Sequence, residues 1–180
     1  HRSCVVIGGG KVAERKIKTL LASGADVIVI SPMLSPYLQE QREHFHFLER
    51  TYRTGDGKGA FLVVAATDDK NVNRQVYEDT KNSCPFLNIV DHPDLCTFFF
   101  PAVLERGQLK IAISTCGTNP TVAKLVRDEL DTFIGPEYQA FLRRMSEMRK
   151  EMFRRVDNPE QRTRLLQDLA RKERESLNKL

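Results

Sequence analysis

Three consecutive glycines near the amino terminus, Gly8-Gly9-Gly10, follow an apolar run and precede a helical pattern. Gly8, Gly10 and Ala13 occupy the three small positions of the G-x-G-x-x-[GA] turn that binds dinucleotides in a βαβ unit. Gly8 permits a tight turn, Gly10 lets the backbone approach a pyrophosphate, and Ala13 lets the helix pack closely on the sheet. Helix amides without partners would then face the phosphates. The motif predicts a dinucleotide site, with a purely structural turn as the alternative.

Four segments are expected at the carboxyl edge of a parallel sheet, where open α/β sheets bind ligands. They are Gly8–Val12, Ser31-Pro32-Met33, Thr67-Asp68-Asp69 and Asn88–His92. The second segment is unusual, because an acidic residue normally ends the second strand and holds the ribose hydroxyls. Here the strand ends without an acid, and no Arg stands nearby for a 2′-phosphate. These rules alone therefore do not decide between NAD and NADP.

Among the acidic residues at strand ends, Asp91 is the candidate for catalysis. It follows the apolar run 86–90, so it should project into the crevice beside a cofactor, where it could accept a proton as hydride leaves the substrate. The alternative is a turn-forming Asp before His92-Pro93, since Asp favours turns, and position alone favours neither. One of Asp68 and Asp69, by contrast, is expected to cap a helix.

The loop 114–120, with the sequence Ser-Thr-Cys-Gly-Thr-Asn-Pro, stands where a later helix should begin. Thr118 or Asn119 should cap this helix, with Pro120 at its first position. The same loop could hold a substrate carboxylate at the helix amino terminus. The structural and the binding role are compatible.

Apolar runs separated by helical patterns predict the elements that position these residues. Strands are expected at 4–8, 27–30, 45–52, 61–66 and 86–90, and helices at 11–23 and 69–81. Buried strands that alternate with helices indicate an α/β fold, a parallel sheet covered on both faces.

The pattern changes after the last of these strands. Two β-prone runs, 97–104 and 108–115, flank Arg106-Gly107 and predict a hairpin. Helices are then expected at 121–133, 137–155 and 159–179, with breaks at Gly135-Pro136 and Asn158-Pro159.

Composition bounds the classes of function. The chain has 180 residues, is 41% apolar and carries a net charge of +4, which suits one core with an appendage or two small domains. Its four cysteines show no C-x-x-C spacing, which favours reduced thiols over disulfides or zinc. His44 and His46 have no third ligand nearby, so no metal site is predicted.

The carboxyl-terminal part is basic, with 12 Lys and Arg against 7 Asp and Glu in residues 143–180. These cations alternate with acidic and apolar residues, and no aromatic residue follows Phe153 to stack on bases. A solvated helix surface is therefore expected, with no nucleic-acid partner. No apolar run approaches the ~20 residues that span a bilayer, and no signal peptide is visible. We expect a cytoplasmic protein with no membrane partner.

Taken together, these motifs resemble siroheme synthases, in the order found there and over nearly the whole chain. The shared motifs are Gly8–Lys16, Ala65–Asp69, Asn88–Asp91 and the loop 114–120. The resemblance is to the precorrin-2 dehydrogenase/sirohydrochlorin ferrochelatase portion of the family. It implies a Rossmann-like parallel sheet forming an NAD-binding domain in 1–100. It further implies a β-hairpin/helix dimerisation region in 101–133 and a helical C-terminal domain in 134–180.

The resemblance also implies an activity and its residues. The expected reaction is NAD-dependent oxidation of precorrin-2 to sirohydrochlorin by a homodimer, in some members followed by insertion of ferrous iron. The catalytic residue would be Asp91. Cofactor contacts would fall on Gly8, Gly10, Lys11, Val12, Ser31, Pro32, Met33, Thr67 and Asp68. Family members also lack the ribose-binding acid and bind NAD mainly through backbone there. Because precorrin-2 carries many carboxylates, substrate contacts are expected from Thr115, Gly117, Asn119, Arg15 and Lys16.

Two departures from the family pattern accompany the resemblance. Many members have glycine where this chain has Cys116 and serine where it has Thr115, so the loop or the crevice beside it should differ. No methyltransferase domain follows, so a stand-alone enzyme that receives precorrin-2 made elsewhere is expected. The rival function is a regulatory module that senses NAD without chemistry. The glycine turn fits both, but Asp91 has no evident task in a sensor.

Overall fold

The computed structural model describes residues 2–177. Its internal contacts divide the chain between Phe100 and Pro101 into two compact units. The first contains a five-stranded sheet with its helices, and the second contains a two-stranded sheet and three helices.

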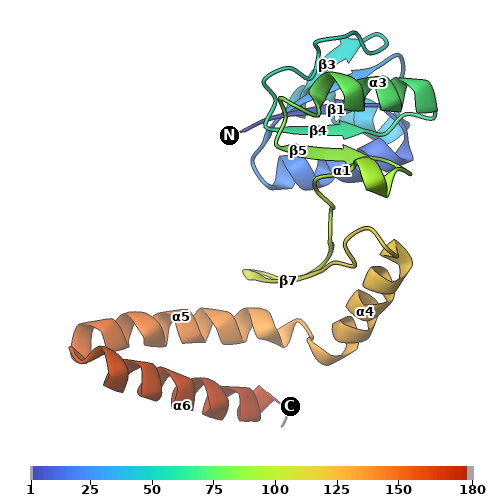
Figure 1. Ribbon diagram of the computed structural model, residues 1–180. Coiled ribbons are helices and arrows are strands. Elements are labelled where there is room, and N and C mark those ends of the chain that lie inside the picture. Colours follow the sequence, from blue (N-terminus) through green and yellow to red (C-terminus); the bar gives the residue numbers. More distant parts are fainter. Residues whose placement is uncertain (1, 178–180) are drawn as a thin grey trace. The chain divides into compact units, whose positions relative to one another are not determined.

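The first unit is built on a parallel sheet with the strand order β3-β2-β1-β4-β5 (Figure 1). Its strands are β1 (Ser3–Ile7), β2 (Asp26–Ser31), β3 (His46–Glu49), β4 (Leu62–Ala65) and β5 (Phe86–Ile89). The chain winds outward from β1 in one direction and then in the other, so the order reverses between β1 and β4. A dinucleotide-binding half-fold has this order, and its ligand site lies at the reversal. The predicted Rossmann-like sheet is confirmed.

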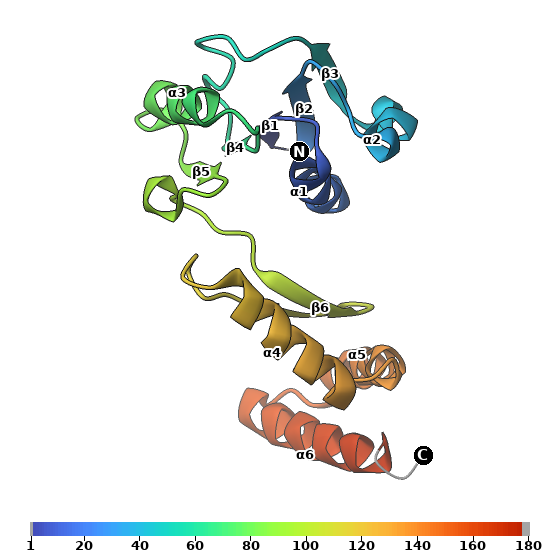
Figure 2. The same ribbon diagram turned by 90° about the vertical axis from the view of Figure 1, so that its right-hand side faces the viewer.

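Helices cover both faces of this sheet because every second residue of a strand points to the opposite face. Val6 of β1 packs in one hydrophobic cluster with Ile17 of α1 (Lys11–Ala22) and Leu38 of α2 (Pro36–Glu40). Val5 packs in the other cluster with Val76 of α3 (Lys70–Thr80). Figure 2 shows α3 on one side of the sheet and α1 with α2 on the other.

Three short helical elements escaped the sequence prediction: α2 and the 3-10 turns Arg42–His44 and Pro93–Leu95. The expected strand at 97–104 was wrong over its first five residues, because β6 begins only at Ala102. The amides of Thr97 and Phe98 instead both donate to the Leu87 carbonyl, at 3.0 and 3.1 Å. This segment therefore lies against the outer edge of β5 and does not belong to the hairpin.

The second unit consists of the hairpin β6 (Ala102–Arg106) and β7 (Leu109–Ile113), and of α4 (Pro120–Phe133), α5 (Glu137–Arg155) and α6 (Pro159–Leu177). The helices end and begin at the two predicted breaks. Within this unit α4 lies along the hairpin, and α5 and α6 form an antiparallel pair (Figures 1 and 2).

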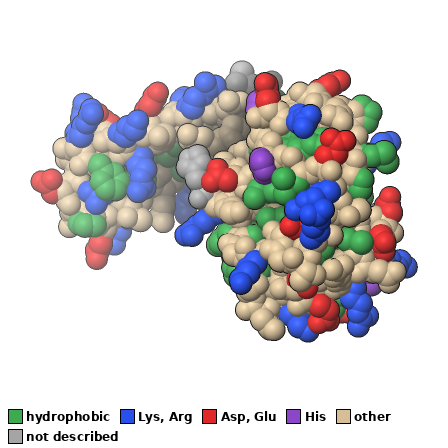
Figure 3. Space-filling view, turned by 90° about the horizontal axis from the view of Figure 1, so that it is seen from above, with side chains coloured by type: hydrophobic (Ala, Val, Ile, Leu, Met, Phe, Trp, Pro, Cys, Tyr) green, Lys and Arg blue, Asp and Glu red, His purple; other side chains and the backbone are tan. Residues whose placement is uncertain are grey.

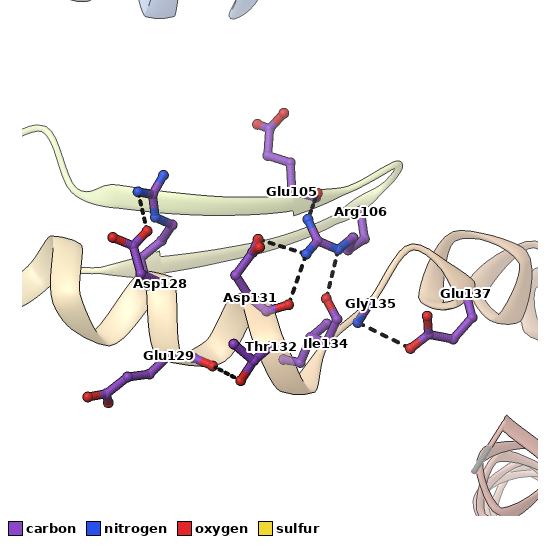
Figure 4. A network of polar contacts seen from close by, with 10 residues as sticks. Glu105, Arg106, Asp128, Glu129, Asp131, Thr132, Ile134, Gly135 and Glu137 are labelled. Atoms are coloured by element: carbon purple, nitrogen blue, oxygen red, sulfur yellow. Dashed lines mark hydrogen bonds and ion pairs between the residues drawn. The ribbon is translucent and has the colours of Figure 1, made fainter. Parts of the chain in front are cut away.

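Arg106 ties the hairpin to the carboxyl end of α4 (Figure 4). Its Nε donates to the Ile134 carbonyl at 2.7 Å, and its Nη2 bonds the Asp131 carboxylate at 2.8 Å. A cation at a helix carboxyl terminus satisfies carbonyls that lack intrahelical partners and interacts favourably with the helix dipole. These bonds therefore join the carboxyl end of α4 to the end of β6.

Basic and acidic side chains are interspersed over the face that Figure 3 shows. No helix in residues 2–177 is long and apolar enough to cross a membrane.

Candidate active site

The strands of the first unit end level with one another at the carboxyl edge. Ile7 is the register partner of Ile30 on one side and of Ala65 on the other, and Ala65 is the partner of Ile89. The residues that follow these four positions therefore emerge from one edge. Since neighbouring strands lie about 4.8 Å apart, the strand leading to Asp91 lies about 10 Å from β1. The four predicted segments are thus brought together.

The glycine turn is packed tightly on one side and open on the other. Gly8 has a φ of +116°, and a Cβ there would stand 2.3 Å from the Ala66 carbonyl oxygen. A Cβ on Gly9 would stand 2.1 Å from the Met33 carbonyl oxygen. A Cβ on Gly10, by contrast, meets no described atom within 4 Å. Gly8 and Gly9 therefore close the turn, while Gly10 leaves space for a ligand.

The first turn of α1 fits a pyrophosphate. Gly10 is the N-cap residue, and no side chain in the described part of the chain caps this helix. The first intrahelical bond runs from the Glu14 amide to the Gly10 carbonyl at 2.9 Å. The amides of Lys11, Val12 and Ala13 precede that bond and suit an anion, which the positive end of the helix dipole also favours.

Backbone lines the end of β2, where a ribose would be expected. The Ser31 hydroxyl donates to the Met33 carbonyl at 2.7 Å, and the Ser35 amide donates to the Gly9 carbonyl at 2.7 Å. These bonds fold the loop Ser31-Pro32-Met33 onto the glycine turn. The Met33 side chain is 78% exposed. The geometry agrees with a ribose held without a carboxylate at this position.

Asn73 holds Thr67 at the end of β4, and sequence reasoning missed it. Its buried side chain accepts from the Thr67 amide at 3.2 Å and donates to the Thr67 carbonyl at 2.9 Å. The sequence feature that could have revealed Asn73 is an amide side chain on the apolar face of α3, next to Val72. Asp69 caps α3, as predicted for one of the two acids, and Asp68 is exposed.

Asp91 is an exposed residue in a tight turn beyond β5. The His92 amide donates to the Ile89 carbonyl at 3.2 Å, which places Asp91 third in a four-residue turn. Its φ is +63°, in the left-handed region. Only glycine adopts that region freely, and other residues there cost roughly 1–2 kcal/mol, although Asp and Asn tolerate it best. The turn-forming and the site-facing interpretations of Asp91 are thus compatible in this geometry.

Arg15 and Lys16 lie on α1 in different environments. Arg15 is exposed, whereas Lys16 is half-buried, with its Nζ 4.2 Å from the centre of the Phe100 ring. Burial lowers the pKa of Lys16, and the charge of Arg15 lowers it further. Lys16 is therefore packed against an aromatic ring, whereas Arg15 is open to solvent.

The loop 114–120 belongs to the second unit. Asn119 caps α4 by accepting from the Thr121 and Val122 amides at 3.1 and 3.2 Å, and Pro120 is the first helical residue, as predicted. The Asn119 amide donates to the Thr115 hydroxyl at 3.2 Å.

Two consecutive residues of this loop have a left-handed backbone. Cys116 has a φ of +51° and Gly117 a φ of +79°. A glycine would adopt the Cys116 conformation without strain. The Cys116 side chain is exposed, so this residue presents a free thiol from a strained position of the loop.

Three comparisons show which known proteins this chain is similar to. The family model described as "Putative NAD(P)-binding" matches residues 1–102. Among curated relatives, "Siroheme synthase" from Thioalkalivibrio sulfidiphilus is 36% identical over 170 residues, which cover 93% of this chain and 35% of that protein. "Siroheme synthase" from Pseudomonas fluorescens is 40% identical over 136 residues, which cover 74% and 29%. The chain thus spans about a third of the length of the curated relatives it matches.

A solved structure shares the architecture of the whole chain. "SirC, precorrin-2 dehydrogenase" superposes with a TM-score of 0.81 at 25% sequence identity, covering 99% of this chain and 95% of that one. The likeness therefore extends beyond the nucleotide-binding unit to the hairpin and the helices. The chain belongs to the siroheme synthase family, to the portion that carries an NAD(P)-binding unit of the Rossmann type.

Proposed function

We propose that this chain oxidises precorrin-2 to sirohydrochlorin with NAD as the hydride acceptor. One observation carries the proposal: an uncapped helix behind a tight glycine turn and an exposed carboxylate, Asp91, emerge from the same edge of one sheet. The similarity to a precorrin-2 dehydrogenase and to siroheme synthases supports it.

The chain's own residues bind and orient the cofactor. The amides of Lys11 and Val12 would hold the pyrophosphate, beside the space that Gly10 leaves open. Thr67 and Asp68 would line the neighbouring strand end. The segment 31–41 contains no Lys or Arg that could bind a 2′-phosphate, and we take NAD as the cofactor of the proposed reaction.

The oxidation removes two hydrogens from the substrate, one as hydride and one as a proton. NAD, when bound, supplies the acceptor for the hydride. Asp91 would accept the proton at its carboxylate, directly or through a water molecule, as a general base does. The same carboxylate could take protons from pyrrole nitrogens if ferrous iron is inserted afterwards.

Binding of the substrate carboxylates is assigned to cations and to a helix terminus. Arg15 is exposed on α1 and available for an ion pair. Lys16 would bind a substrate carboxylate either from its position over the Phe100 ring or after its side chain moves away from that ring. Thr115, Gly117 and Asn119 surround the amino terminus of α4, which favours anions.

We also propose that the second unit pairs with a second copy of this chain. Only Leu104 and Ala123 are buried hydrophobic residues there, within the described range. Several apolar side chains of α4 are exposed instead, among them Leu125 at 55% and Phe133 at 76%. Apolar surface of this kind marks an interaction site. Sedimentation equilibrium should show a dimer.

The test replaces Asp91 with Ala and follows NADH formation from precorrin-2, with iron insertion measured separately in the same sample. Turnover should fall by at least about 100-fold, as expected on removing a general base, while the Kd for NAD stays within about two-fold. Asp94→Ala is the matched control, since Asp94 is an exposed carboxylate three residues away. Full activity of Asp91→Ala would refute the assignment of Asp91.

The rival NAD sensor makes a different prediction in the same assay. It would bind NAD in a calorimetric titration but would form neither NADH nor sirohydrochlorin from precorrin-2. That pair of results would overturn the proposed activity while leaving the glycine turn as a nucleotide site.

A further inference from the structure

Both ends of the turn that carries Asp91 contact the sulfur atom of Cys96. Cys96 Sγ accepts a hydrogen bond from the Ile89 amide at 3.2 Å. It also lies 3.3 Å from the carbonyl oxygens of Ile89 and His92. Ile89 and His92 are the first and last residues of the turn, so one side chain contacts both of its ends.

The local chain path explains how Cys96 reaches this place. The 3-10 turn Pro93–Leu95 follows His92 directly and reverses the chain, with the Cys96 amide donating to the Pro93 carbonyl at 3.2 Å. Thr97 then anchors the chain on β5, because its hydroxyl accepts from the Leu87 amide at 2.8 Å. Cys96 is therefore held between the Asp91 turn and the strand that precedes it.

The thiol can both accept and donate here. Burial raises the pKa of the Cys96 thiol, so it keeps its proton at neutral pH. The sulfur accepts from the Ile89 amide, while the S–H group can donate to one of the two carbonyls in reach. An apolar side chain of similar size would fill the space but make neither bond.

We propose that Cys96 is a positioning residue for Asp91, clamping both ends of its turn and so holding the carboxylate at the cofactor edge. The turn needs such support, because a left-handed backbone at a residue other than glycine persists only where its surroundings enforce it. The inference rests on the proposed function, in which Asp91 accepts the substrate proton.

A matched control lies at the other end of β5. Cys84 is a free cysteine that is buried, whereas Cys96 is half-buried. Its Sγ donates to the Phe86 carbonyl at 3.3 Å, and burial raises the pKa of both thiols. Cys84→Ala therefore removes a thiol of the same size, and no less buried, from the same unit. It leaves the Asp91 turn untouched.

The experiment compares Cys96→Ala, Cys96→Ser and Cys84→Ala in the full chain. Cys96→Ala should lower kcat for precorrin-2 oxidation by about 10- to 100-fold, the size expected when a reacting group is displaced. The KM for precorrin-2 and the Kd for NAD should stay within about two-fold. Cys96→Ser should recover part of the rate, because its hydroxyl keeps both hydrogen-bonding functions on a shorter bond. Cys84→Ala should keep kcat within about two-fold.

A second readout does not depend on activity. Amide hydrogen exchange at Ile89 and His92 should become at least about ten-fold faster in Cys96→Ala and stay unchanged in Cys84→Ala. Retained protection of the Ile89 amide in Cys96→Ala, or an equal kcat in the two alanine variants, would overturn the positioning role. An unmodified chain that oxidises no precorrin-2 would instead refute the proposed function, while the exchange comparison still decides whether Cys96 clamps the turn.

Discussion

The two units of this chain differ in how completely they bury their apolar residues. In the first unit, Val6, Ile17 and Leu87 are fully buried between a sheet and helices on both faces. In the second, Leu104 and Ala123 are the buried hydrophobic residues of the described range, while Leu125 and other apolar side chains of α4 face outward. A two-stranded sheet is marginal by itself. The first unit therefore buries a core of its own, whereas the second leaves apolar side chains exposed, which is why we propose that it pairs with a second copy.

The largest effect should come from the same truncation made in each unit. Leu87→Ala leaves a cavity in the core of the first unit and should lower its free energy of unfolding by about 2–5 kcal/mol. Leu125→Ala removes a side chain that is 55% exposed. At protein concentrations low enough for the chain to be monomeric, it should lower the free energy of unfolding by less than about 0.5 kcal/mol. Hydrogen exchange resolved by peptide measures both.

A charge at the second position tests the association directly. Leu125→Asp should shift the sedimentation equilibrium from dimer to monomer and leave exchange in the first unit unchanged. Two results would contradict the proposal that the second unit forms an apolar interface: an unmodified chain that is monomeric, or a Leu125→Asp variant that dimerises with unchanged affinity.

A smaller difference in stability is expected between alanine substitutions at the two ends of the glycine turn, Gly8 and Gly10. Gly8→Ala places a Cβ against the Ala66 carbonyl at a left-handed φ, and should destabilise the first unit by at least about 2 kcal/mol. Gly10→Ala meets open space, so unfolding should change by less than about 1 kcal/mol. Its methyl group would stand at the ligand's approach and should raise the Kd for NAD about ten-fold. Calorimetric titration checks the second value, and an unchanged Kd would contradict the assigned site.

The smallest effect concerns one ion pair in each unit. In the first, hydrogen bonds from Arg50 and the Arg53 amide hold the pKa of Asp56 below its usual range. This stability is present above the unfolded pKa of about 3.9 and is lost as pH falls through the lower folded value. Asp56→Asn should therefore cost about 1 kcal/mol or less at pH 7 and flatten the loss of stability below about pH 4. Asp131→Asn, at a carboxylate that is 55% exposed, should cause no measurable change in the same denaturation series.

Much of the fold could be predicted because it is encoded locally. The period of apolar residues marks strands and helices, and Pro or Gly marks the breaks at Gly135-Pro136 and Asn158-Pro159. Prediction failed at 97–101, where β-prone side chains lie against an existing strand and do not start a new one. A run of apolar residues does not say which partner it will meet.

The candidate site divides in the same way. The glycines of the turn and the acid after β5 could be predicted from residue type alone, because sterics and side-chain chemistry act at single positions. The roles of Asn73 and Cys96 cannot be read from residue type, because each acts through hydrogen bonds to residues four to seven positions away that only the folded chain brings within reach. The environment of Lys16 likewise depends on Phe100, which is distant in sequence.

By itself, the sequence determined that a phosphate-binding turn opens a parallel sheet, that Asp91 follows a neighbouring strand, and that a hairpin and helices come after. Local sterics and periodicity suffice for these conclusions. Only the tertiary structure decided that the strand ends are level, that the Cys96 sulfur contacts both ends of the Asp91 turn, and that α4 leaves apolar residues exposed. The first two features depend on how the strands and the segment after β5 pack in the folded unit, and the third depends on which side chains the folded second unit covers.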